Sequence, residues 1–104
     1  MTWVLLLAAA VLEAVWAIAL KKSHGLTELV PSAVFLGALV ASMVLLALAL
    51  RQLPVGTAYA VWTGGGAVTA ALAGMVLLGE PATASRLAAI GLVAVGIAWL
   101  ASAA

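Results

Sequence analysis

The sequence predicts an all-α membrane protein with four transmembrane helices in a single domain. It is 68% hydrophobic and only 7% charged, with a mean hydropathy of +1.38, which leaves too little polar surface for a soluble domain of this size. Long apolar stretches recur along the chain, each near the ~20 residues that a helix needs to cross ~30 Å of hydrocarbon. The connections between them are short, so consecutive helices should be antiparallel neighbours with both termini on one side.

The first two stretches are apolar with few interruptions. The first contains one acid, Glu13, and ends at Lys21 and Lys22. It is not expected to be a cleaved signal peptide, because Glu13 interrupts it and no basic segment precedes it. The second contains Pro31 and Ser42 and ends before the polar residues Arg51 and Gln52. The expected spans are about residues 3–20 and 29–50.

The last two stretches are separated by a polar turn that runs from Gly79 to Arg86. They predict spans at about residues 55–78 and 87–103. Basic residues bias orientation only weakly, since three lie on the loop face opposite the termini and Arg51 lies on the other. The sign of this difference in basic residues would by itself place both termini on the outer side of the membrane. Insertion in both orientations is compatible with so small a bias.

Several classes of function are not expected. The chain has no cysteine and one histidine, His24, which sits in a loop without a second ligand nearby, so we expect no metal and no cofactor. The spans offer no nucleophile and base at usable spacing, which argues against an enzyme. No nucleotide-binding motif and no nucleic acid partner are expected.

Glu13 is the most informative residue, because it is the only acid within a long apolar stretch. An ionised carboxylate within the bilayer has a high free energy unless it is protonated, paired with a cation or hydrated. Such a residue therefore indicates a functional site. At about 100° per residue, Ala9, Ala10, Trp16 and Ala17 share its helix face. The small neighbours leave room for a ligand, and Trp16 offers a ring face and an N–H donor. One alternative is that Glu13 forms a structural hydrogen bond and stays protonated, and another is that Trp16 is an interfacial anchor.

The third span carries a second group of candidate residues. Tyr59 and Trp62 are three positions apart and share a face that could line the same cavity as Glu13. The run Gly64, Gly65 and Gly66 weakens a helix by roughly 1 kcal/mol per residue, which indicates either a hinge or tight packing against a neighbour. Ser42, the polar residue in the middle of the second span, either reaches a pocket or bonds to its own helix.

Four helices of this size fill their own centre with side chains, so a solute pathway requires an oligomer. The fourth span has small residues at Ala88, Gly91 and Gly96, which let membrane helices approach closely. We interpret Gly91 and Gly96 as a dimer contact. Ordinary packing within one subunit is the alternative.

These residues resemble the small multidrug resistance family of four-helix bacterial transporters, and more narrowly its guanidinium-exporter subtype. The resemblance runs the full length and is strongest over three blocks, which are Glu13 to Lys21, Ser23 to Thr27 with Pro31 and Ser32, and Leu53 to Gly64. It implies an antiparallel homodimer in the bacterial inner membrane that bends at the glycines of its third helix. It also implies a binding site formed by Glu13, Trp16, Ser42, Tyr59 and Trp62.

Three positions depart from the family pattern. Ala10 stands where glycine is expected, Gly65 where a larger apolar residue is expected, and Lys22 where an aromatic or apolar residue is common. The departures bear on substrate size, on the hinge and on strict guanidinium selectivity, but each of the five site positions is kept.

The resemblance implies proton-coupled export of guanidinium or small substituted guanidinium ions by alternating access. A proton and a cation would compete for Glu13, and competition alone gives exchange. A broader exporter of quaternary ammonium ions is the first alternative, and a non-transporting structural or regulatory membrane subunit is the second. A heterodimer with a related chain is an alternative to the homodimer.

Overall fold

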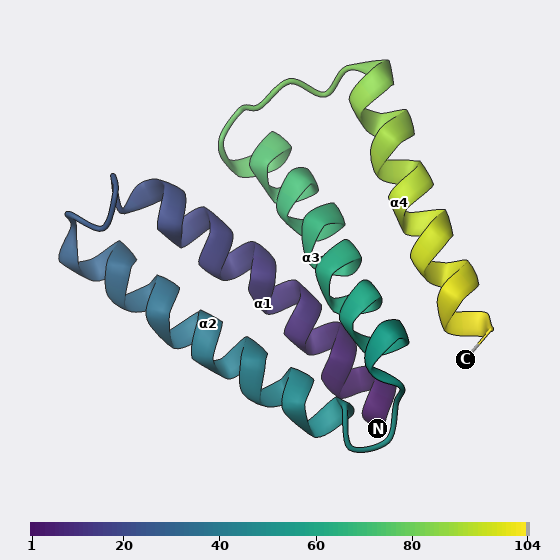
Figure 1. The fold of residues 1–104 in the computed structure, drawn as a ribbon. Helices are drawn as coiled ribbons and strands as arrows, with labels where there is room; N and C mark the ends of the chain where they lie inside the picture. Colours follow the sequence, from purple (N-terminus) through teal and green to yellow (C-terminus); the bar gives the residue numbers. More distant parts are fainter. Residues whose placement is uncertain (104) are drawn as a thin grey trace.

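The computed structural model describes residues 1–103 as four α-helices joined by short loops (Figure 1). Each helix is long and apolar enough to cross a membrane. No strand occurs within the described residues. The predicted fold of four apolar helices is therefore confirmed. The helices are α1 (Thr2–Lys22), α2 (Leu29–Ala49), α3 (Val55–Leu77) and α4 (Ala84–Ser102).

The helices form a flat array in which consecutive helices run in opposite directions (Figure 1). Helix α1 packs against both α2 and α3, and in the described part of the chain the backbone of α4 approaches α3 alone. The principal extents are 40 × 34 × 18 Å. Both termini lie at the same end of the array (Figure 1). The first three helices thus form a unit around α1, with α4 at its edge.

The tightest packing lies toward the end that holds the termini. A buried apolar cluster joins Leu6 of α1, Leu46 and Ala49 of α2, and Ala58 and Val61 of α3. Ala49 and Ala58 are the small members of this cluster, and their short side chains let the helices approach closely where lipid removes the hydrophobic drive between them. Elsewhere many large apolar side chains face outward, as a lipid-facing surface requires.

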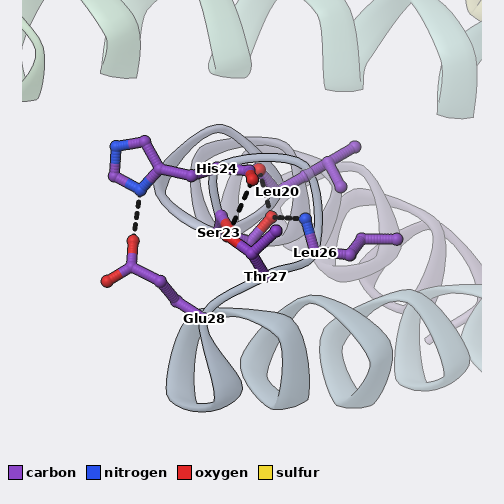
Figure 2. A network of polar contacts seen from close by, with 6 residues as sticks. All are labelled: Leu20, Ser23, His24, Leu26, Thr27 and Glu28. Carbon is purple, nitrogen blue, oxygen red and sulfur yellow. Dashed lines mark hydrogen bonds and ion pairs between the residues drawn. The ribbon is translucent and has the colours of Figure 1, made fainter.

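The loop between α1 and α2 is a compact cap built around Ser23 (Figure 2). The buried Ser23 hydroxyl donates to the Leu20 carbonyl at 2.7 Å and accepts from the Leu26 amide at 3.0 Å. These contacts hold His24 and Leu26 at positive φ, on either side of Gly25. The His24 ring contacts the Glu28 carboxylate (Figure 2). Glu28 is therefore engaged within its own loop.

The helix bounds lie close to the expected spans, and the largest difference is at the start of α4. Ala84, Ser85 and Arg86 are helical, so placing them in the turn was wrong. The reason is an N-cap, because the Thr83 hydroxyl accepts from the Arg86 amide at 3.2 Å. Arg86 also lies 3.7 Å from the Glu80 carboxylate, which closes the turn.

Candidate functional site

Glu13 lies between α1 and α3, almost removed from the surface. Its side chain is 9% exposed, and within residues 1–103 it has neither a cationic partner nor a hydrogen bond. It packs onto Gly66, where an added Cβ would overlap the carboxylate. An acid that is buried without a partner is expensive in a membrane. The structural alternative required a hydrogen bond, and the described residues supply none.

Ser42, Tyr59 and Trp62 form one connected group between α2 and α3. The Trp62 indole N–H donates to the Ser42 hydroxyl at 2.9 Å, and that hydroxyl donates to the Ala9 carbonyl of α1 at 2.7 Å. The ring of Tyr59 lies against Trp62, with centroids 5.6 Å apart. Ser42 thus bonds across to a neighbouring helix, and the alternative of a bond to its own helix was wrong.

This group lies about one helical turn from Glu13. Ala9 precedes Glu13 by four residues, and Trp62 precedes Gly66 by four residues. Helices α1 and α3 run in the same direction (Figure 1), so both steps lead the same way by about 6 Å. Tyr59 is 55% exposed, which leaves its ring accessible. A carboxylate, a hydroxyl and two aromatic rings therefore lie within about one helical turn of each other along α1 and α3.

We expect Ser42→Ala to lower the free energy of unfolding by about 1–2 kcal/mol. The substitution leaves the Trp62 indole N–H without its acceptor and removes the second donor to the Ala9 carbonyl, which keeps its bond within α1. Thermal unfolding in detergent measures the effect. Ser32→Ala is the matched control on α2, because the buried Ser32 hydroxyl has no partner among residues 1–103. Equal loss in both variants would contradict a linking role for Ser42.

Trp16 is held by a neighbour that the sequence did not reveal. Its ring meets Phe35 of α2 edge to face, with centroids 6.0 Å apart. Its indole N–H is buried and finds no acceptor in the described chain. Trp16 lies about one turn beyond Glu13, but no contact joins it to the Ser42 group. Phe35 is the only phenylalanine. It lies in a span that is apolar throughout, so the sequence did not indicate that it contacts Trp16.

The three glycines of α3 serve close packing in this structure. A Cβ at Gly64 would lie 2.5 Å from Ile97 of α4, and a Cβ at Gly65 would lie 3.1 Å from the Ala10 methyl. Gly66 receives Glu13, and the helix continues unbroken through the run. The packing alternative is thus what the structure shows, and the hinge stays a prediction.

Two of the departures from the family pattern face each other. The Ala10 methyl occupies the space that a side chain at position 65 would need. An extra methyl on α1 is therefore compensated by a missing side chain on α3. The close approach of the two helices beside Glu13 therefore depends on both positions.

Thr69 is a polar residue near the site that sequence reasoning missed. Its hydroxyl lies 2.9 Å from the Gly65 carbonyl, 3.1 Å from the Gly66 carbonyl and 3.3 Å from the Ala10 carbonyl. One hydroxyl proton serves one acceptor at a time, so Thr69 shares its donor between α1 and α3. Its spacing from the glycines was a usable signal, because threonine bonds back to carbonyls three and four residues earlier.

The candidate site is closely packed in the single chain. Ser42 is fully buried and Glu13 is nearly so, and the described cavities do not include any of the five site residues. On α4, nothing lies within 4 Å of a Cβ added at Gly91 or Gly96, and no described residue of this helix is buried. These glycines are thus open in the single chain, which leaves their expected role as a dimer contact a prediction.

Comparison with known proteins shows the family of this chain. The model of the family described as "Small Multidrug Resistance protein" matches residues 1–93. The chain belongs to the small multidrug resistance family. Proteins named "Guanidinium exporter" from Escherichia coli (strain K12) and Citrobacter freundii are each 54% identical to it over 100 residues, covering 96% of this chain and 95% of their own length. A guanidinium exporter from Salmonella typhimurium matches equally well.

Membership in the small multidrug resistance family confirms the resemblance inferred from the sequence. These relatives are named as exporters and not as enzymes, which agrees with the expectation that the chain is not an enzyme. Together with its four apolar helices, membership identifies the chain as a multi-pass membrane protein.

Proposed function

We propose that this small multidrug resistance protein exports guanidinium or small substituted guanidinium ions in exchange for protons. The observation that carries the proposal is Glu13, an unpaired and nearly buried acid within a membrane-spanning helix. A negative charge in that position attracts a cation or a proton. The guanidinium exporters that share 54% of its residues support guanidinium as the cation.

The contacts around Glu13 suit a planar cation with several N–H donors. Its carboxylate can accept two parallel hydrogen bonds from a guanidinium fork. The Ser42 hydroxyl accepts one hydrogen bond from Trp62 and donates to Ala9, which leaves it one further acceptor position. The rings of Tyr59 and Trp62 offer faces to the positive charge. The Trp16 N–H, which lacks an acceptor here, can donate to a carboxylate in the assembled site.

The proposed transporter is an antiparallel homodimer in the bacterial inner membrane. The site residues line none of the described cavities of one chain, and the exposed face of α4 with Gly91 and Gly96 offers a surface for a partner. A second copy would bring a second Glu13 to a shared chamber. The weak charge bias of the loops is compatible with insertion of the chain in both orientations, which such a dimer needs.

The proposed mechanism rests on competition. A proton removes the charge that binds the cation, and the cation excludes the proton. Each Glu13 carboxylate therefore binds either a proton or a cation at one time. If the loaded dimer opens alternately to each side, an inward proton gradient drives cation export. In an antiparallel pair the two end states differ by exchange of subunit conformations, so they are nearly equal in energy. Bending at Gly64, Gly65 and Gly66 would supply the motion.

We expect guanidinium binding to weaken as the pH falls. Over the pH range in which Glu13 takes up protons, one-for-one competition lowers the apparent affinity by about tenfold per pH unit. Above that range the carboxylates are ionised and the affinity levels off. Calorimetric titration of the purified chain at several pH values measures this slope. Affinity that does not change with pH would refute exchange at a shared carboxylate.

A second candidate substrate class is the quaternary ammonium ions. The Tyr59 and Trp62 pair, with its exposed phenol ring, is an observation that favours it, because aromatic faces bind alkylammonium ions without hydrogen bonds. Competition between guanidinium and tetramethylammonium in proteoliposomes separates the two. If guanidinium fails to compete with a transported ammonium ion, guanidinium is not the substrate.

A further inference from the structure

A second ligand-sized feature lies on the opposite side of α1 from Glu13. It is an open groove with a cavity volume of about 450 Å³, which is the size of a small-molecule site. The α1 residues that line it are Val11, Ala14, Val15, Ile18, Ala19 and Lys22. At about 100° per residue, these residues centre on the face opposite Glu13. The groove is therefore separate from the site proposed for transport.

The groove has the length and chemistry of a lipid chain. From Lys22 to Val11 it follows α1 for about 16 Å, which is close to half of the ~30 Å hydrocarbon layer and so to the depth of one leaflet. Val30 and Val34 of α2 form one wall, and Ala73 and Leu77 of α3 belong to the other side. Apart from Lys22, every lining residue is apolar.

The mouth of the groove carries a positive charge without a partner. Lys22 is the exposed last residue of α1, and it lines the groove together with Val30 near the start of α2 and Leu77 at the end of α3. The acids near this end are engaged elsewhere, because Glu28 contacts His24 (Figure 2) and Glu80 faces Arg86. Within residues 1–103, Lys22 makes no ion pair. An ammonium at the end of a spanning helix reaches the level of lipid headgroups.

From this geometry we infer that the groove binds an anionic phospholipid. One acyl chain lies between α2 and α3 on α1, and the phosphate meets Lys22. The charge complementarity selects a lipid with net negative charge over a zwitterionic one, because both present the same acyl chains. The bound lipid would join the three helices at the end where the apolar cluster of Leu6 and Leu46 is absent.

Native mass spectrometry of the purified full-length chain tests this assignment. The probes are phosphatidylglycerol and phosphatidylcholine with identical acyl chains, each added to the detergent-solubilised protein. We expect preferential retention of phosphatidylglycerol, and about fivefold weaker retention in Lys22→Gln. Lys21→Gln is the matched control, since this exposed lysine does not line the groove. Ala73→Leu should fill the groove and weaken retention of both lipids.

Several results would overturn the assignment. Equal retention of the two lipids, or equal losses in Lys21→Gln and Lys22→Gln, would remove the role of Lys22. Displacement of the lipid by guanidinium would assign the groove to the transported cation. A disulfide between two copies of Val34→Cys in a bilayer would show that a second chain covers the groove. Lipid retention does not depend on transport, so failure of the proposed function leaves this test intact.

Discussion

Glu13→Gln is expected to abolish proton-coupled guanidinium transport and to weaken guanidinium binding by about 100-fold or more. The substitution keeps the size of the side chain but removes its charge. Two charge-assisted hydrogen bonds contribute at least about 3 kcal/mol together, which corresponds to that loss of affinity. The pH dependence of the remaining binding should disappear as well, since the group that takes up the proton is gone. Calorimetry and flux into proteoliposomes measure the two effects.

The same variant separates transport from a structural role. Glutamine at position 13 keeps hydrogen-bonding capacity, so a subunit that used Glu13 only to bond a partner helix should assemble and function normally. Glu28→Gln is the matched control, because Glu28 is an exposed loop acid that contacts His24. Transport that survives Glu13→Gln at the normal rate, with its pH dependence intact, would refute the proposed mechanism.

The sequence predicted the four helices and drew attention to Glu13 because both depend on local properties. Hydrophobic length alone determines which segments can span a bilayer, and one charge in such a segment stands out without knowledge of its neighbours. The start of α4 was harder, since the cap at Thr83 is a short-range hydrogen bond within a polar turn. A threonine three residues before Arg86 was the available signal.

The contacts between helices could not be predicted in the same way. The Ser42 hydroxyl reaches both Ala9 and Trp62, and this depends on how α2 crosses its neighbours. The meeting of Trp16 with Phe35 has the same origin. All four helices are apolar on every side, so no amphipathic pattern shows which faces meet. The groove at Lys22 remained hidden for that reason.

The glycine run illustrates how one pattern fits two physical causes. Flexibility and close approach both require the absence of a side chain, so the sequence left a hinge and tight packing as alternatives. In the structure the three glycines closely approach Ile97, Ala10 and Glu13 in turn. The two causes are compatible, because a helix can pack closely in one state and bend in another.

Gly66→Ala should reduce transport by roughly tenfold or more while the protein still assembles in the membrane. A methyl group at this position overlaps the Glu13 carboxylate and crowds its Cβ, so the carboxylate must move or α1 and α3 must separate. Overpacking of this kind costs about 1–3 kcal/mol. Either response displaces the acid from its position about one helical turn from Ser42 and Trp62. Flux into proteoliposomes and thermal unfolding in detergent measure the two consequences.

A double-mutant cycle identifies the carboxylate as the cause. In the Glu13→Ala background the methyl at position 66 no longer meets a carboxylate, and only its contact with the Cβ at position 13 remains. Its cost in unfolding free energy should therefore fall by about 1 kcal/mol. Gly37→Ala is the matched control, because a Cβ at this α2 position meets nothing within 4 Å. There alanine should stabilise the helix slightly. If Gly66→Ala costs the same with and without Glu13, or if it transports normally, then contact between Gly66 and Glu13 does not position the acid.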